Sequence, residues 1–364
     1  MIKQLKKFSV NLIAGANVAT VAMMCLSGYS DHLSPEKYPT LFCLGIAFPV
    51  MLLANCAFLF FWLIFKWQKI WIPIIGYVLV FSPIRIYFPL NFSQSPPEDA
   101  IKIISYNVCT YGGNYKYENA FDTIYSYLQK EKPDIVCVQE DVDSWRKYVL
   151  QKYQQTFAYN DTTVFVENSK LYNAVGIHTR YPILKKEKIL YSSTANGSVA
   201  YFLQVGKDTI LVINNHLEGT HLSAEDRAKY KNLLRGRIGQ DTVREESKLL
   251  LHKLETAAAI RAPQSEAVHQ YVEDHRQYPI IVCGDFNDSP ISYTRRVIAQ
   301  GLTDCYVETG KGLGLSYNQK GFFFRIDHIF CSEHFEPYQC VVDDKIDYSD
   351  HNPIVCWLKL KKND

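Results

Sequence analysis

Long apolar stretches fill the first ninety residues of this 364-residue chain, and shorter apolar runs separated by polar groups dominate the rest. Residues 8–30 and 38–65 contain no Asp, Glu, Lys or Arg, and each exceeds the roughly 20 apolar residues that a bilayer span requires. A third stretch is interrupted by Pro73 and Pro83. The pattern predicts a membrane anchor over residues 1–90 with three transmembrane helices, at about 8–30, 38–65 and 70–88.

Basic residues beside these stretches indicate the orientation. One side carries only Lys37 and Arg85 close to the spans, whereas the side of the N-terminus carries Lys3, Lys6, Lys7, Lys66 and Lys69. The positive-inside rule then predicts a multi-pass protein of the cytoplasmic (inner) membrane, with its N-terminus in the cytoplasm and the region after three crossings on the outer side. With only two crossings, that region stays in the cytoplasm.

The N-terminus has a second interpretation. A basic start followed by an apolar run is also the pattern of a cleaved signal peptide. This run is longer than a usual signal core, and two more apolar stretches follow it. We therefore favour an uncleaved anchor, joined by a Pro/Ser linker at residues 91–100 to a domain at residues 101–364.

The remaining chain, about 260 residues, is long enough for one α/β domain. Residues 117–130 have helical spacing and precede Pro133. The charged region at about residues 221–275 predicts a helical insertion, either a solvated hairpin on the sheet or a lid that meets anionic groups through Arg227, Lys229, Lys231, Arg235 and Arg237. Runs rich in β-branched and aromatic residues predict strands at 101–108, 135–138, 163–166, 174–178, 200–205, 209–214, 279–283, 326–331 and 354–358.

Polar patches follow several of these predicted strands. Polar residues at the ends of several strands meet at one edge of a sheet, so residues far apart in sequence can form one active site. The patches are Ser105-Tyr106-Asn107, Val138-Gln139-Glu140, Asn214-Asn215-His216-Leu217, Gly284-Asp285-Phe286-Asn287, Arg325-Ile326-Asp327-His328 and Ser349-Asp350-His351.

The donor types in these patches suit a hard divalent cation. Glu140 and Asp350 are carboxylates and Asn107 adds an amide oxygen, a set that fits Mg²⁺ or Mn²⁺ better than zinc. We expect these three residues to form the metal site.

The other polar residues suit proton transfer. His216 and His351 can donate to a phosphate oxygen or move a proton near neutral pH, and Asp327 can hold one imidazole in a single tautomer. Asp285 and Asn287, two residues apart, can both hold an attacking water. The set predicts metal-assisted hydrolysis of a phosphate ester.

In order and spacing, these patches resemble the endonuclease/exonuclease/phosphatase superfamily from about residue 101 to 357. The resemblance implies a four-layer αββα sandwich of two packed mixed β-sheets flanked by helices. It further implies that Asn107 and Glu140 hold the metal, that Asp350 completes the shell or binds through water, and that Asp285 activates the water beside Asn287. Asp327 would orient His351 against the phosphate, with His216 as a second donor. Ser316-Tyr317 loosely matches the pair that precedes the family's Arg-x-Asp segment.

Each residue taken alone has a simpler explanation, since a single Asp or His at a strand end is usually a solvated group or a turn former. His328 is expected to face away from the site. The ordered set favours an enzyme over a catalytically silent binding domain.

Composition leaves the substrate open. A net charge of +2 gives no sign of the basic surface that nucleic-acid binding usually needs. A lipid headgroup or a nucleic acid are both retained as phosphate-ester substrates, with membrane lipids as partners of the anchor and no protein partner inferred. Seven cysteines lie beyond residue 100 without a CxxC pair, and unpaired thiols would fit the two-crossing topology better.

Overall fold

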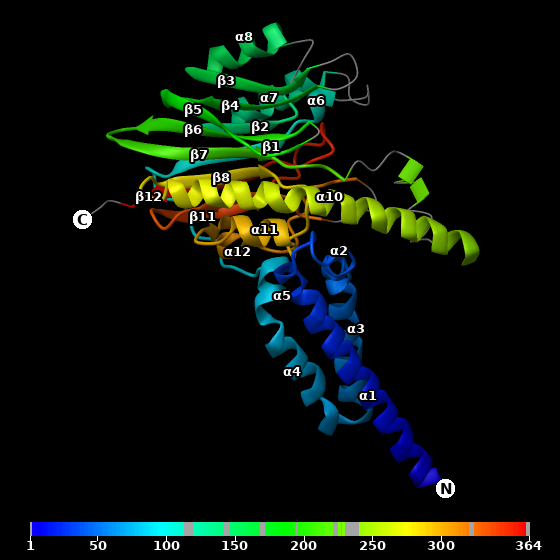
Figure 1. Ribbon diagram of the computed structural model, residues 1–364. Helices are drawn as coiled ribbons and strands as arrows, with labels where there is room; N and C mark the ends of the chain where they lie inside the picture. The colour runs from blue at the N-terminus through cyan, green and yellow to red at the C-terminus, as the bar shows by residue number, and fades with distance from the viewer. Residues whose placement is uncertain are drawn as a thin grey trace.

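The protein consists of an N-terminal group of helices and a layered α/β domain that sits on one end of it (Figure 1). The computed structural model describes residues 2–112, 119–141, 146–167, 172–193, 195–220, 225–226, 228–229, 240–319 and 324–361. The helical group comprises α1 (Ile2–Gly28), η1 (Ser30–His32), α2 (Pro39–Phe42), α3 (Leu44–Phe65), η2 (Trp67–Lys69), α4 (Trp71–Leu79) and α5 (Phe81–Tyr87).

Helices α1 and α3 are each long and apolar enough to cross a membrane. At the predicted third span the chain forms two helices, α4 and α5, bent by 63° relative to each other, which is the geometry of either a broken span or a re-entrant loop. Pro83 has no N–H to donate to the carbonyl of Leu79, one turn earlier. The hydroxyl of Tyr29 donates to that carbonyl at 2.7 Å. Tyr29, the residue after α1, thus supplies the hydrogen bond that the Leu79 carbonyl lacks within its own helix, and this bond stabilises the bend.

A chain of buried hydrogen bonds joins helices α1, α3 and α4. Trp62 Nε1 donates to Asn17 Oδ1 at 2.9 Å, and Asn17 Nδ2 donates to Asn55 Oδ1 at 3.1 Å. Asn55 Nδ2 in turn donates to the Pro73 carbonyl at 3.1 Å. Each amide is fully buried, and hydrogen bonds between helices of this kind specify which faces pack together.

The domain contains two six-stranded mixed sheets. The first has the order β11-β12-β1-β2-β4-β3 and the second the order β5-β6-β7-β8-β10-β9. Only the neighbours β1 and β2 and the neighbours β7 and β8 are parallel among the pairs described. The strands are β1 (Ile101–Asn107), β2 (Ile135–Gln139), β3 (Tyr159–Glu167), β4 (Tyr172–Thr179), β5 (Ile183–Ile189), β6 (Gly197–Val205), β7 (Asp208–His216), β8 (Ile280–Asp285), β9 (Thr303–Asp304), β10 (Asp327–Cys331), β11 (Phe335–Val342) and β12 (Ile354–Leu360).

The two sheets pack face to face through buried apolar side chains such as Ile103, Val212 and Ile281. Two helices, α7 (Ala120–Glu131) and α8 (Arg146–Thr156), cover the outer face of the first sheet. The outer face of the second sheet is covered by α10 (Gln240–Asp274) and α11 (Tyr293–Ile298). The predicted four-layer αββα sandwich is confirmed. Two short helices, α6 (Cys109–Gly112) and α12 (Cys305–Thr309), lie in connecting segments.

The structure describes only part of the charged region after His216, so the predicted helical hairpin stays a prediction. Helix α10 covers 35 residues of this region, and Val268 and Val272 near its C-terminal end pack on the second sheet. Lys229 of the predicted basic segment pairs with Glu225 and Glu246 at 3.1 Å each. Its other members, Arg227, Lys231, Arg235 and Arg237, lie outside the described residues.

The helical group meets the domain at α11 and at the loop before it (Figure 1). Ile291, at the end of that loop, is 2% exposed and packs with Met24, Phe48, Val80 and Tyr87 of the helices. Since Met24 and Phe48 belong to the two candidate spans, this loop contacts both of them.

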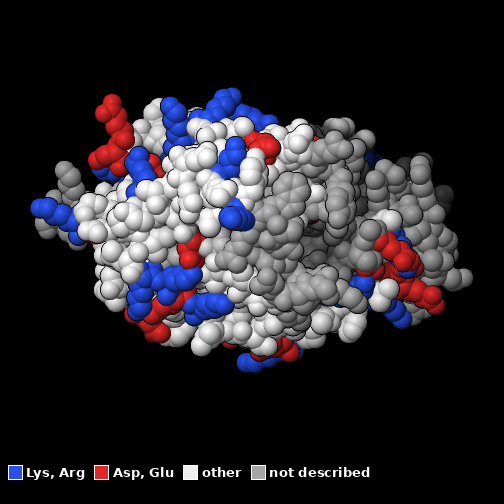
Figure 2. Space-filling model, turned by 90° about the horizontal axis from the view of Figure 1, so that it is seen from above, with Lys and Arg blue, Asp and Glu red and all other residues white. Residues whose placement is uncertain are grey.

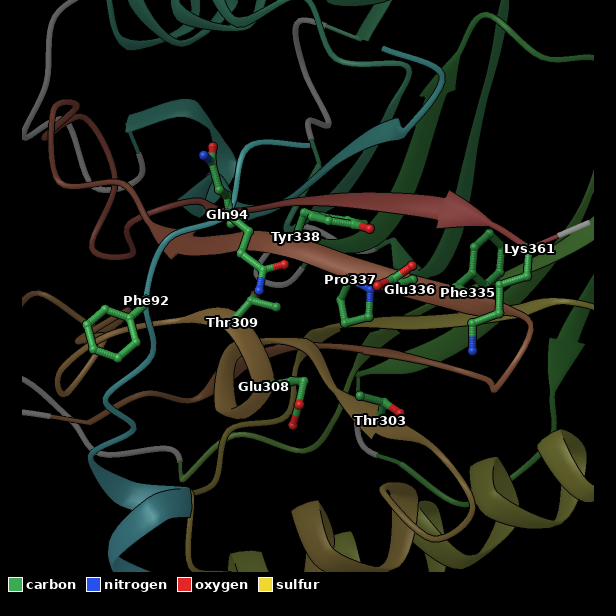
Figure 3. Close-up of a pocket in the computed structure, with 11 residues that line it drawn as sticks. Phe92, Gln94, Thr303, Glu308, Thr309, Phe335, Glu336, Pro337, Tyr338 and Lys361 are labelled. Carbon is green, nitrogen blue, oxygen red and sulfur yellow. The ribbon is translucent and has the colours of Figure 1, made fainter. Parts of the chain in front are cut away.

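The linker after α5 also lies on the domain. Asn91 Nδ2 donates to the carbonyls of Val307 and Gly310 at 2.9 Å each. Farther along, Phe92 and Gln94 line a pocket of about 470 Å³ together with α12 and β11 (Figure 3). None of the predicted site residues lines this pocket.

Candidate active site

Strand register brings the predicted residues to one edge of the sandwich. In the first sheet, Asn107 at the end of β1 pairs with Gln139 at the end of β2. In the second sheet, Asp285 at the end of β8 pairs with both His216 of β7 and Asp327 of β10. The two parallel pairs end at the same edge, and the sheets are joined there because Asn107 Nδ2 donates to Asp285 Oδ2 at 3.0 Å.

Asp285, His351 and Asp327 form a buried proton network. His351 Nδ1 and Asp327 Oδ2 are 2.8 Å apart, and His351 Nε2 lies 3.7 Å from Asp285 Oδ2. Burial alone lowers the pKa of His351, but Asp327 and Asp285 together raise it well above its ordinary value. Burial raises the pKa of Asp285 to about 6, against the opposing effect of His351. The two carboxylates therefore favour the protonated form of the His351 ring that lies between them.

The loop around Ser349 and the segment at Ser316 fix this network in place. Ser349 Oγ donates to the carbonyl of Asn107 at 2.7 Å and accepts from the backbone N–H of His351 at 3.2 Å. Ser316 Oγ accepts from the backbone N–H of Asp327 at 3.0 Å. Tyr317 packs edge-on against the His351 ring, with centroids 5.1 Å apart. The loosely matched Ser316-Tyr317 pair therefore borders the site.

A chain of amides sets the tautomer of His216. Asn196 Nδ2 donates to the Leu217 carbonyl at 2.6 Å, and Asn173 Nδ2 donates to Asn196 Oδ1 at 2.9 Å. His216 Nδ1 then contacts Asn173 Oδ1 at 3.1 Å. Because a carbonyl only accepts, every donor in this chain is fixed, and His216 Nδ1 must carry a hydrogen.

His216 Nε2 points into the site. It lies 3.8 Å from both Glu140 Oε1 and Asp285 Oδ2. With Nδ1 protonated, Nε2 can donate to a phosphate oxygen only in the imidazolium form. Burial lowers the pKa of His216, and Asp285 opposes that effect. Whether this residue is a donor therefore depends on the balance between burial and the Asp285 carboxylate.

Asn107 and Glu140 face each other at the ends of β1 and β2. Asn107 Nδ2 donates to Glu140 Oε1 at 3.1 Å, and its Oδ1 accepts from the backbone N–H of Cys109 at 3.0 Å. The amide nitrogen thus stands between the Glu140 and Asp285 carboxylates. The amide would have to turn over for Asn107 to offer its oxygen to a cation.

Asp350, like Glu140, is half-buried. Its backbone carbonyl accepts from Asn318 N at 2.9 Å. Its side chain and that of Glu140 both act on Cys109, where burial, then Asp350 and Glu140, raise the pKa of the thiol. Cys109, which no sequence motif singles out, therefore lies close to two of the predicted ligands.

Asn287 and Gly284 shape the turn that carries Asp285. The backbone N–H of Asn287 donates to Asp285 Oδ1 at 2.8 Å, and its Nδ2 donates to the Leu217 carbonyl at 2.9 Å. Gly284 has φ +133°, and a Cβ there would lie 2.0 Å from the carbonyl oxygen of Asn215. Only glycine allows β7 and β8 to approach so closely just before the site.

His328 faces away from the site, as predicted. Its ring is fully buried and stacks on Phe330 with centroids 5.6 Å apart at 11°. Burial lowers its pKa to about 3, so it stays neutral.

The donor set fits a hard divalent cation near Glu140. Two carboxylates, Glu140 and Asp285, face one partially positive amide nitrogen at 3.1 and 3.0 Å, an arrangement that a cation with oxygen ligands would also satisfy. Asp285, Asp327 and His351 likewise offer ligand atoms within 4.8 Å of one another. The same three side chains form the proton network described above.

Comparisons with known proteins agree with this geometry. The model described as "Endonuclease/Exonuclease/phosphatase family" matches residues 104–351, and one described as "Domain of unknown function (DUF8431)" matches residues 10–87. No curated protein matches the chain significantly.

Solved structures show the same fold. An endonuclease/exonuclease/phosphatase family protein from Bacteroides thetaiotaomicron is 16% identical, with a TM-score of 0.51 over 74% of this chain and 100% of that one. One from Leptotrichia buccalis is 17% identical, with a TM-score of 0.50 over 72% and 100%. Since the family model spans more than half of the sequence, this chain belongs to the endonuclease/exonuclease/phosphatase family.

Proposed function

We propose that the protein is a membrane-anchored, Mg²⁺-dependent phosphoesterase that hydrolyses a phosphodiester or phosphomonoester by attack of water. The observation that carries this proposal is the buried ring of His351 between Asp327 and Asp285, beside the facing carboxylates of Asp285 and Glu140. Positive hydrogen-bond donors beside a carboxylate base are what hydrolysis of an anionic ester needs.

The cation would be held by Glu140 and Asn107, with Asp350 binding directly or through water. Bound there, Mg²⁺ (or Mn²⁺) would supply Lewis-acid stabilisation of the phosphoryl oxygens. Oxygen ligands without a thiolate favour these ions over zinc.

The protein's own residues would divide the remaining work. Asp285, with its pKa near 6, would take a proton from the attacking water as the new P–O bond forms, and Asn287 would help to hold that water. His351 and His216 would donate to the phosphoryl oxygens as charge develops, while the ester oxygen leaves from phosphorus. Asp327 would keep His351 protonated and oriented.

A substrate at the membrane surface is supported by the position of the loop after Asp285. Ile291 packs against the candidate spans and follows Asp285 by six residues, so the two Cα atoms are at most about 20 Å apart. The headgroup layer on each side of a bilayer is roughly 5–8 Å thick. A phosphate ester in a lipid headgroup would therefore be within reach of this edge.

The described part of the face in Figure 2 gives no comparable support for nucleic acid. Lys and Arg are interspersed with Asp and Glu on the described part of the face seen in Figure 2. Two lysines of β5 are also paired, Lys185 with Glu187 and Lys186 with Asp161, at 2.5 Å each. Nucleic acid remains the alternative substrate class, which would make the protein a nuclease. A catalytically silent binding domain is the alternative of a different kind.

For topology, we propose three crossings, with the N-terminus in the cytoplasm and the domain on the outer side of the cytoplasmic membrane. The lysines at the N-terminus and after α3 support this orientation. The bent pair α4 and α5 would form the third crossing.

A substrate panel tests the function. Full-length protein in lipid nanodiscs with Mg²⁺ would be given sphingomyelin, phosphatidylinositol phosphates, plasmid DNA and RNA, with Asp285→Asn as the inactive control. We expect lipid headgroup hydrolysis that Asp285→Asn abolishes. Preferential cleavage of DNA or RNA would support the nuclease alternative, and no turnover of any substrate would support the silent binding domain.

A further inference from the structure

The loop that follows Asp285 is held by hydrogen bonds at its start and in its middle. At its start, Asn287 binds the Asp285 carboxylate and the Leu217 carbonyl. In its middle, Asp288 Oδ2 accepts from Thr294 Oγ1 at 2.9 Å and from Arg261 Nε at 3.3 Å. We therefore expect a displacement of Ile291, at the far end of this loop, to shift Asp285 as well.

That far end is held by the helical group at a close backbone approach. A Cβ built on Gly45 of α3 would lie 2.6 Å from the carbonyl oxygen of Ile291 and 3.0 Å from Ser30 Oγ. Real Cβ atoms essentially never come within 3.0 Å of a neighbour, and ordinary contact begins at 3.4 Å. Any side chain at Gly45 would therefore push the loop away by 3.0 − 2.6 = 0.4 Å to 3.4 − 2.6 = 0.8 Å.

A second connection reaches the strand that carries Asp327. Arg325, two residues earlier, is 1% exposed. Its guanidinium donates to the carbonyls of Ile86 at 2.5 Å and Leu313 at 2.9 Å and lies over the Tyr306 ring at 4.3 Å. Ile86 belongs to α5, the last helix of the group, so the planar guanidinium of Arg325 joins that helix to the start of β10.

We propose that the outer end of the anchor is a positioning part of the active site, with Gly45 and Arg325 as positioning residues. Gly45 sets the loop of Asp285 and Asn287 against α3, and Arg325 sets β10 and Asp327 against α5. This assignment rests on the proposed function for its catalytic consequence. The competing explanation is that the anchor only tethers an independent domain, whose geometry ignores these contacts.

Kinetics on a soluble probe separate positioning from membrane recruitment. The full-length chain in nanodiscs would hydrolyse bis(p-nitrophenyl) phosphate with Mg²⁺, as wild type, Gly45→Ala and the matched control Gly15→Ala. Gly15, in α1, has nothing within 4 Å of a built Cβ. Since a misplacement of 1 Å can cost about 10²-fold, we expect kcat of Gly45→Ala to fall about tenfold with KM unchanged, and Gly15→Ala to match the wild type.

A second pair of variants covers the case in which Gly45→Ala does not fold. Arg325→Lys keeps the charge but loses the fork that reaches two carbonyls, so kcat should fall about tenfold. The control Arg85→Lys alters an exposed pair with Glu308, 46% and 52% exposed, and should have no effect. Wild-type kcat for Arg325→Lys, or for a folded Gly45→Ala, would overturn the proposal.

Hydrogen exchange tests the coupling without relying on activity. We expect Gly45→Ala, or Arg325→Lys if that variant alone folds, to speed amide exchange in peptides covering residues 285–291 or 325–331, with no change in its control. Unchanged exchange in both regions would refute the positioning role even if the protein hydrolyses nothing. Faster exchange in a protein without phosphoesterase activity would keep the coupling and refute the proposed function instead.

Discussion

Replacing Asp327 by asparagine tests how the imidazolium of His351 is maintained. The two side chains are 2.8 Å apart and both are buried. A hydrogen bond to a charged group is worth about 1.5–3 kcal/mol, and each 1.36 kcal/mol corresponds to a factor of ten. Because asparagine has the same shape, the fold should survive. We expect Asp327→Asn to lower kcat by about 10–150-fold.

The pH profile gives the sign of the effect. Despite burial, Asp327 and Asp285 raise the pKa of His351, so the ring stays protonated at ordinary pH and loses its proton only as the pH rises through that elevated value. Removing the Asp327 charge lowers this pKa. The alkaline limb of the kcat profile should therefore move to lower pH.

Initial rates on bis(p-nitrophenyl) phosphate from about pH 5 to 9 would measure both effects. Asp343→Asn is a matched control, since Asp343 is also buried and its carboxylate accepts from Tyr127 at 3.0 Å and from Lys345 N at 3.1 Å, neither of them a predicted site residue. It should keep the wild-type rate. If Asp327→Asn also kept the wild-type rate and alkaline limb, our assignment of Asp327 would be wrong.

Three further outcomes are expected. Asn173→Ala leaves the buried Nδ1–H of His216 without its acceptor, a cost of about 1–3 kcal/mol, so kcat should fall about 10–100-fold. The control Asn160→Ala, which breaks a similar bond to His178, should have no effect. Equal rates for the two variants would argue against a role for the amide chain that holds His216. Glu140→Gln should raise the Mg²⁺ concentration for half-maximal activity, and an unchanged metal titration would remove Glu140 from the site. A reporter fused after Asp364 should behave as exported, whereas protection of the domain in intact spheroplasts would contradict the three-crossing topology.

The interior strands could be predicted from sequence because both of their faces are buried. β7 and β8 are apolar almost throughout, since one face meets the other sheet and the other face meets helices. β5 was missed because it is an edge strand whose residues Leu184 to Lys186 are exposed. β11, at the edge of the first sheet, carries a register shift between Tyr338 and Val341 that breaks its alternation.

Much of the site could be predicted from the sequence as a set of residues, but their arrangement in space could not. Asp285 and Asp327 were selected by their motifs, and the strand register that sets them opposite each other depends on long-range pairing. Asn173 and Asn196 were not selected, because their only signal is the amide chain that links strand β4 to the end of β7. The approach of Gly45 to Ile291 spans more than two hundred residues, and no local pattern reveals it.

The most direct test of water attack at this site is hydrolysis of bis(p-nitrophenyl) phosphate in ¹⁸O-labelled water by the full-length protein. With Mg²⁺, we expect one label in the phosphate-containing product, loss of turnover in EDTA, recovery with Mg²⁺ or Mn²⁺, and a decrease of at least about 10²-fold in Asp285→Ala and His351→Ala. Turnover that persists in EDTA or in either variant would contradict the proposed chemistry, and so would restoration by zinc alone.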